Sequence, residues 1–194
     1  MNENQLGSRI NGGNTAYARN DGDFYPTPPE ATIALLRSPF GNMIGCQSVW
    51  ECACGDGHIS AVFEKAGNAV VSTDISDECY GQGGVDFLNE AERRAEWIVT
   101  NPPFCLSEAF IRKAKSLGGN CAFLLKSQYW HSKRRLPLFL DFAPAYVMPL
   151  TWRPDFLFKT RGGGSPLMDC IWCVWGSSGS SQTLYLPLKK PKQE

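Results

Sequence analysis

The sequence predicts an α/β protein with a largely parallel sheet. Short apolar segments alternate along the chain with segments of helical periodicity, which is the pattern of successive βαβ units. Glycine, acidic or amide residues follow four of the predicted strands directly. Because ligands bind in the crevice outside the carboxyl ends of parallel strands, we expect these four loops to meet at one site.

The composition predicts one domain of ordinary size. The chain has 194 residues, 43% hydrophobic and 20% charged, and its 19 basic side chains balance 19 acidic ones. A chain of this length buries about 70% of the surface of its unfolded form, enough for a core without metal or disulfides. The even charge balance excludes a strongly basic nucleic-acid coat protein, so a polyanionic partner needs a local basic patch.

The N-terminal segment is expected to lie outside the folded domain. Residues 1–23 are polar and rich in Asn and Gly, so we expect them to be flexible, with residues 24–190 forming a single domain. The segment lacks the apolar stretch of a secretory signal, and the apolar runs of the chain are shorter than the ~20 residues of a membrane helix. We therefore expect a cytoplasmic protein with no membrane partner.

The elements follow in order from local signals. Thr27 is expected to cap a helix that starts at Pro28 and continues through Ala31 to Leu36, with Glu30 completing a capping box. Apolar periodicity predicts the other helices at residues 58–65, 107–117 and 130–142. Apolar runs bounded by turn residues predict strands at residues 49–52, 68–73, 83–88, 97–100, 121–125, 145–149, 167–175 and 184–188.

The eight cysteines do not predict a metal site. Only Cys170 and Cys173 have the C-x-x-C spacing, and they fall in a predicted strand, where positions three apart point to opposite faces. One metal ion is not easily held that way. We expect the cysteines to be small, reduced core residues.

The loops after the first three predicted strands are suited to an adenosine ligand without a diphosphate. Gly55 and Gly57 allow a tight turn, but the third glycine of a dinucleotide-binding loop and the G-K-[ST] of a P-loop are missing. Asp74 lies about 20 residues after Gly55, where an acid reaches ribose hydroxyls. Asp86 can accept from an adenine amino group, with Phe87 packed beside it. Together with Glu51, these acids suit the cationic sulfonium of S-adenosylmethionine.

The fourth loop carries the most specific motif, Asn101-Pro102-Pro103-Phe104. The Asn101 amide oxygen and the Pro102 carbonyl can each accept a hydrogen bond, and the two stiff prolines hold both acceptors in place. Two acceptors aimed at one planar amino group localise the nitrogen lone pair and make it nucleophilic. Phe104 offers a face on which the ring carrying that nitrogen can stack.

These motifs, in this order over residues 24–175, resemble the class I S-adenosylmethionine-dependent amino-methyltransferases, especially the gamma-type DNA N6-adenine methyltransferases in a compact, phage-type form. The resemblance implies a Rossmann-like, doubly wound sheet of seven strands, mostly parallel, with one antiparallel strand near the C-terminal edge. It implies catalytic roles for Asn101, Pro102, Pro103 and Phe104. It also implies that the cofactor is held by Tyr25, Thr27, Glu51, Cys52, Gly55, Gly57, Asp74, Ile75, Asp86, Phe87 and Asn101.

The implied activity is methyl transfer to the N6 amino group of adenine in DNA, either single-stranded or with the base flipped out. Residues 24–190 then form one methyltransferase domain with no separate target-recognition domain. Basic residues near the predicted crevice are candidates for DNA contacts, besides Phe104 for the base: Lys126, Lys133, Arg134, Arg153 and Arg161.

Several alternatives remain open. The same chemistry on an RNA base or a protein glutamine amide shares the N-P-P-aromatic motif. A non-catalytic subunit that binds the cofactor is another alternative, although such a subunit has no use for an intact Asn101 motif. A nucleotide-binding oxidoreductase is disfavoured by the incomplete glycine pattern.

Overall fold

A computed structural model describes residues 25–156, 166, 168–176 and 182–192. The expected flexible segment 1–23 and the candidate Arg161 lie outside these residues. No helix within the described residues has the length and apolar character needed to cross a membrane.

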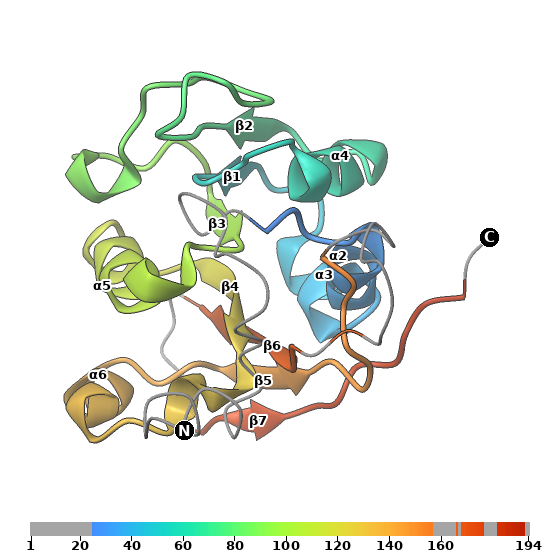
Figure 1. The fold of residues 1–194 in the computed structure, drawn as a ribbon, viewed down its shortest axis with the longest axis vertical. Helices are drawn as coiled ribbons and strands as arrows, with labels where there is room; N and C mark the ends of the chain where they lie inside the picture. The colour runs from blue at the N-terminus through green and yellow to red at the C-terminus, as the bar shows by residue number, and fades with distance from the viewer. Residues whose placement is uncertain (1–24, 157–165, 167, 177–181, 193–194) are drawn as a thin grey trace, which may run out of the picture.

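Seven strands form one sheet in the order β2-β1-β3-β4-β6-β5-β7 (Figure 1). Every pairing between neighbours is parallel except those of β6, which runs antiparallel to both β4 and β5. The mostly parallel seven-stranded sheet, with one antiparallel strand near the C-terminal edge, is confirmed. The strands are β1 Val49–Glu51, β2 Val70–Ser72, β3 Trp97–Thr100, β4 Cys121–Lys126, β5 Tyr146–Pro149, β6 Cys170–Trp175 and β7 Leu184–Tyr185.

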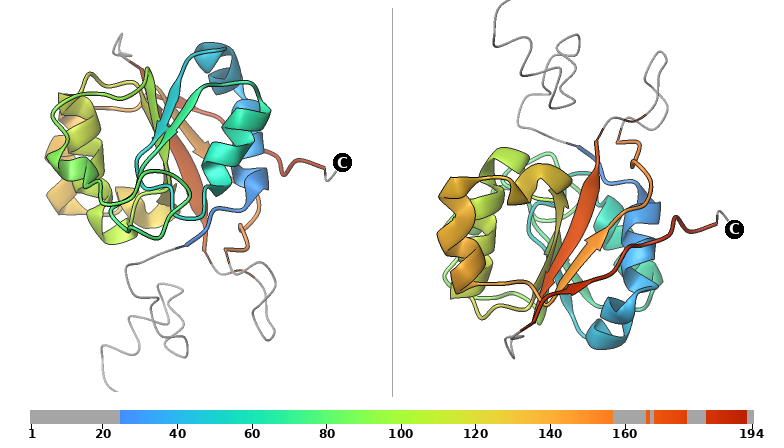
Figure 2. Two further views of the ribbon diagram at one scale, coloured as in Figure 1. Left: turned by 90° about the horizontal axis from the view of Figure 1, so that it is seen from above. Right: turned by 90° about the horizontal axis from the view of Figure 1, so that it is seen from below.

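Helices cover both faces of this sheet (Figure 2), which makes the fold doubly wound. One face packs against α2 (Pro29–Leu36), α3 (Pro39–Ile44) and α4 (His58–Lys65), and the other against α5 (Ser107–Ser116) and α6 (Leu136–Asp141). Along β4, Ala122 and Leu124 enter the first core, whereas Phe123 and Leu125 enter the second. This alternation explains why β4 reads as a continuous apolar run, since strands buried on both faces need no polar side.

The predicted strand at residues 83–88 is wrong. The chain crosses from β2 to β3 as a loop that contains a short 3-10 turn, η2 (Phe87–Asn89), and pairs with the sheet through one isolated bridge between Thr73 and Gln82. Gly84 has a φ of 68°, a left-handed conformation outside the β region. Val85 and Phe87 are nevertheless buried, so the alternation of apolar residues in this segment indicates burial but not strand pairing.

The single helix predicted at residues 130–142 is also wrong. The turn η4 (Ser127–Trp130) ends at the first residue of this segment, which continues with a second 3-10 turn, η5 (Lys133–Arg135), and is helical only in α6. Pro137 lies in the first turn of α6, because proline lacks the N–H that a continuous helix requires at that point.

The cysteines are all free thiols. Cys170 and Cys173 enter opposite cores, as expected for two strand positions three apart. Five of the eight are buried, but Cys46 and Cys105 are exposed and Cys79 is half-buried, so the expectation of core residues is wrong for these three. Across the described ranges, no group of three or more His, Cys, Asp or Glu side chains is placed to hold a metal ion.

Candidate active site

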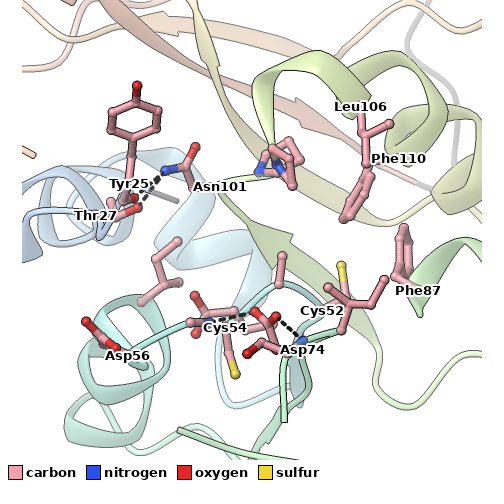
Figure 3. A pocket seen from close by; sticks show the side chains of 18 of the residues that line it. Tyr25, Thr27, Cys52, Cys54, Asp56, Asp74, Phe87, Asn101, Leu106 and Phe110 are labelled. Carbon is pink, nitrogen blue, oxygen red and sulfur yellow. Dashed lines mark hydrogen bonds between the residues drawn. The ribbon is translucent and has the colours of Figure 1, made fainter. Parts of the chain in front are cut away.

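One cavity of about 430 Å³ lies at the carboxyl ends of β1, β2 and β3. All four loops singled out in the sequence line it, so Gly55 and Asn101 share one hollow, as expected (Figure 3). Thirteen of the predicted site residues line it: Tyr25, Thr27, Glu51, Cys52, Gly55, Asp74, Ile75, Asp86, Phe87, Asn101, Pro102, Pro103 and Phe104.

Asp74 joins two of these loops through backbone hydrogen bonds. Its Oδ2 accepts from the N–H of Gly55 at 2.8 Å, and its Oδ1 accepts from the N–H of Ser76 at 2.9 Å. Hydrogen bonds to an ionised acceptor are about twice as strong as neutral ones. Asp74 therefore holds the glycine loop and the loop after β2 in a fixed relation.

Gly57 does not line the cavity, unlike its predicted role as a cofactor contact. It begins α4 in a left-handed conformation, with a φ of 77°. A Cβ at this position would lie 2.1 Å from Cγ of Tyr80. Glycine is needed here because the Tyr80 ring occupies the space of a side chain.

Glu51 is a buried acid in the wall of the cavity. Only 2% of its surface is exposed, and its Oε2 accepts hydrogen bonds from both the backbone N–H and the hydroxyl of Ser60. Burial raises the pKa of this carboxyl group to about 8, and the negative charges of Asp74 and Glu64 add to the rise, while the Ser60 hydrogen bonds oppose it. A buried acid of this kind is suited to receive a cation, which would offset its desolvation.

The opposite end of the cavity is aromatic (Figure 3). The rings of Phe87 and Phe110 lie with centroids 4.9 Å apart, and Trp50 packs against Phe87 at 5.2 Å. Beside them, Asp86 accepts from the N–H of Leu88 at 3.0 Å and is thereby fixed at the start of η2. Phe110 was not anticipated as a site residue. Its only signal is the apolar face of the helix that follows the Asn101 motif.

The side-chain amide of Asn101 is anchored at its nitrogen and not at its oxygen. Its Nδ2 donates to the carbonyl oxygen of Tyr25 and to Oγ1 of Thr27, both at 3.1 Å (Figure 3). Its Oδ1 is buried and has no hydrogen-bond partner among the described residues. A buried acceptor without a partner costs about 1–3 kcal/mol, and such groups are concentrated at functional sites.

Thr27 is not the N-cap of the first helix, so that prediction is wrong. The helix α2 starts at Pro29 with Pro28 at the cap position, and no side chain caps it. Thr27 lies one residue before the cap position, and its hydroxyl accepts a hydrogen bond from Asn101 instead.

Phe104 begins η3 (Phe104–Leu106), immediately after the two prolines. Its ring lies 5.6 Å from that of Tyr25, and Nζ of Lys126 lies 4.3 Å from its centroid, within the range of a cation–π contact. Lys126 thus reaches the Asn101-Pro102-Pro103-Phe104 motif without lining the cavity itself.

The other basic candidates lie away from the cavity. Arg153 pairs with Asp169 at 2.8 Å on the surface. Lys133 is exposed, and Arg134 approaches Glu108 at 3.9 Å with 82% of its side chain exposed. Arg134 lines a second, shallower hollow of about 280 Å³, which shares Leu106 with the main cavity.

The sequence matches no protein-family model, and a search of curated proteins also gives no match. Solved structures with a similar fold do exist. One is a protein from Pyrococcus horikoshii provisionally named an RNA methyltransferase, with a TM-score of 0.56 and 16% identity over 78% of this chain and 86% of the other. The chain shares a Rossmann-like α/β fold with this protein.

Two further structures share this fold. A protein from Vibrio vulnificus, provisionally named the modification subunit of a type I restriction enzyme, aligns with a TM-score of 0.58 and 14% identity over 99% of this chain and 51% of the other. A dimethyladenosine transferase from Plasmodium falciparum aligns with a TM-score of 0.54 and 12% identity over 80% of this chain and 64% of the other. At these identities the likeness concerns the fold alone.

Proposed function

We propose that this protein transfers a methyl group from S-adenosylmethionine to the N6 amino group of adenine in DNA. The observation that carries the proposal is the amide of Asn101. Its nitrogen is held by Tyr25 and Thr27, and its buried oxygen lacks a donor among the described residues. An exocyclic amino group supplies the missing donor.

The lining of the cavity fits a cationic adenosine ligand. It contains five carboxylic acids and neither Lys nor Arg among the described residues: Glu51, Asp56, Asp74, Glu78 and Asp86. Such a wall repels a pyrophosphate, which disfavours a dinucleotide-dependent oxidoreductase, and attracts sulfonium and ammonium groups. When bound, S-adenosylmethionine supplies an electrophilic methyl group.

Each part of the cavity suits one part of this cofactor. Glu51 is placed to hold the amino group of the methionine end, because a cation beside a buried carboxylate offsets its desolvation. Asp74 and the Gly55 loop suit the ribose. Asp86, with Phe87 and Phe110, suits the adenine, by one acceptor and an apolar surface. Tyr25, Cys52 and Ile75 complete this lining.

The chain's own contribution to catalysis is to position and polarise the amino group. Asn101 Oδ1 and the Pro102 carbonyl each accept one N–H of that group, which localises the nitrogen lone pair for attack on the methyl carbon. Nitrogen would bond to the methyl carbon as the bond between that carbon and sulfur breaks, with the electron pair left on sulfur, and one proton of the nitrogen would then pass to water. Positioning and preorganised acceptors of this kind account for much of the rate enhancement of many enzymes.

Nucleic acid is the favoured substrate because one cation lies at the Asn101 motif and a second borders the adjoining hollow. Nζ of Lys126 lies over the ring of Phe104, and Arg134 borders the hollow that adjoins the main cavity at Leu106. A flipped base stacked on Phe104 would gain about 1–3 kcal/mol, enough to offset part of the cost of leaving the duplex. The exposed Lys133 and the surface residue Arg153 are further candidates for phosphate contacts, as is Arg161.

The test is to incubate the protein with isotope-labelled S-adenosylmethionine and unmethylated DNA, RNA or protein, and to analyse the products by mass spectrometry. We expect N6-methyladenine in DNA. The Asn101→Ala variant should lose at least ~100-fold in rate while its calorimetric affinity for the cofactor stays within about threefold of wild type. If the label appeared in RNA or in protein glutamine but not in DNA, the proposed DNA substrate would be wrong and the labelled molecule would replace it. Cofactor binding without transfer to any acceptor would indicate a non-catalytic subunit.

A further inference from the structure

The orientation of the Asn101 amide has a determinant in a distant part of the sequence. A side-chain amide has an accepting end and a donating end, and a rotation of 180° exchanges them. Only the oxygen can bind the N–H of a substrate amino group. With the amide rotated, two N–H groups would face the N–H groups of the substrate. Catalysis therefore requires that one of the two orientations be held.

Two oxygen atoms bind the amide nitrogen in the structure: the Tyr25 carbonyl selects the orientation, and the Thr27 hydroxyl adds a second hydrogen bond that holds it. The carbonyl oxygen of Tyr25 can only accept, and it receives a hydrogen bond from Asn101 Nδ2 at 3.1 Å. Oγ1 of Thr27 accepts from the same nitrogen at the same distance. Thr27 is 4% exposed, so water does not readily replace its hydroxyl.

The segment that carries these acceptors is rigid. Thr27 is flanked by Pro26 and Pro28, whose rings fix their own φ angles. The helix that follows is anchored to the sheet, because Nε1 of Trp172 in β6 donates to the carbonyl oxygen of Ala31 at 2.9 Å. The two acceptors therefore sit on a frame attached to the core.

We propose that Thr27 is a positioning residue, which holds the Asn101 amide with its oxygen towards the amino group of the substrate. This inference rests on the proposed function for its consequence in catalysis, but the hydrogen bond itself can be measured without turnover. Thr27 acts through Asn101, and its role in this inference is separate from any contact with the cofactor.

The kinetic test compares three variants. Thr27→Val keeps the shape but removes the acceptor, and we expect kcat at saturating cofactor to fall roughly 3- to 10-fold, the value of one buried hydrogen bond. Thr27→Ser keeps the hydroxyl and should retain most of the wild-type kcat. Thr32→Val is the matched control, since Thr32 is a buried threonine on α2 whose Oγ1 has no hydrogen-bond partner among the described residues. It should leave kcat unchanged.

A direct readout uses the Asn101 side-chain amide signal in ¹⁵N NMR spectra of the full chain. In wild type and Thr27→Ser its protons should exchange slowly, whereas Thr27→Val should accelerate exchange several-fold and shift the resonance, with Thr32→Val unchanged. An unaltered Asn101 signal in Thr27→Val would overturn the inference, as would equal losses of kcat in Thr27→Val and Thr27→Ser. If no substrate is methylated but the signal responds as expected, the proposed function fails and the positioning contact stands.

Discussion

The buried acid Glu51 should make the stability of the protein depend on pH in a defined window. Its pKa is raised from 4.5 to about 8 in the folded chain, and one pKa unit corresponds to ~1.4 kcal/mol. Between about pH 4.5 and 8 the folded chain therefore keeps a proton that the unfolded chain has lost. Stability from this group is fully present below pH 4.5 and falls as pH rises, by about 5 kcal/mol in total at pH 8 and above.

The assay is urea unfolding of wild type and Glu51→Gln, without cofactor, at intervals from pH 4.5 to 9. A glutamine stays neutral and can still accept from Ser60, so the variant should lack this part of the pH dependence. The free energy of unfolding of Glu51→Gln, relative to wild type, should rise by about 5 kcal/mol across the range. The comparison removes contributions from groups that titrate equally in both proteins.

Glu92→Gln is the matched control, because Glu92 is exposed. Its unfolding free energy should run parallel to that of wild type at every pH. If the curves of wild type and Glu51→Gln were also parallel, the reasoning from burial to a raised pKa would be refuted.

Two further predictions concern the loops of the cavity. Gly57→Ala should destabilise the protein by about 2–5 kcal/mol in urea unfolding, because it combines an unfavourable φ with an overlap on Tyr80. Gly67→Ala is the control: its φ is 94° but its Cβ would meet open space, so it should cost only about 1–2 kcal/mol. Equal losses in the two variants would contradict the role of the Tyr80 ring. Asp74→Asn should weaken cofactor binding at least ~10-fold in calorimetry, because an amide replaces the ionised acceptor of the Gly55 N–H. An unchanged Kd would remove Asp74 from the site.

Apolar periodicity predicted secondary structure correctly where a segment forms a single helix or strand. The predicted helix at residues 58–65 and strand at residues 97–100 match the structure residue for residue. It failed at residues 83–88, where buried side chains alternate along a loop that is not paired as a strand. It failed again at residues 130–142, where the helical pattern covers the end of η4, the 3-10 turn η5 and the short helix α6 with Pro137 in its first turn. In both segments the apolar pattern indicated which side chains are buried, and side chains can be buried in several backbone conformations.

The location of the site was predictable because the informative residue types are rare and their positions are local. Glycines, acids and an Asn-Pro-Pro run at strand ends identify a crevice without knowledge of packing. Contacts between distant segments were not predictable, such as that of Asn101 with Thr27, 74 residues earlier. Phe110 was missed because an amphipathic helix gives the same pattern whether its apolar face lines a cavity or a solid core. The pairing of Arg153 with Asp169 was missed because the charge of a side chain does not identify its partner.

The position of β6 has a consequence for how the chain can be synthesised or divided. All six of its residues are buried, and it bonds to β4 on one side and β5 on the other, although it lies late in the sequence. Until residue 175 has left the ribosome, β4 presents an unpaired edge, apolar in its first five residues, of the kind that pairs with other chains. A fragment ending before residue 170 would therefore tend to aggregate despite containing every residue of the cavity, and a split version of the protein must supply β6 in trans.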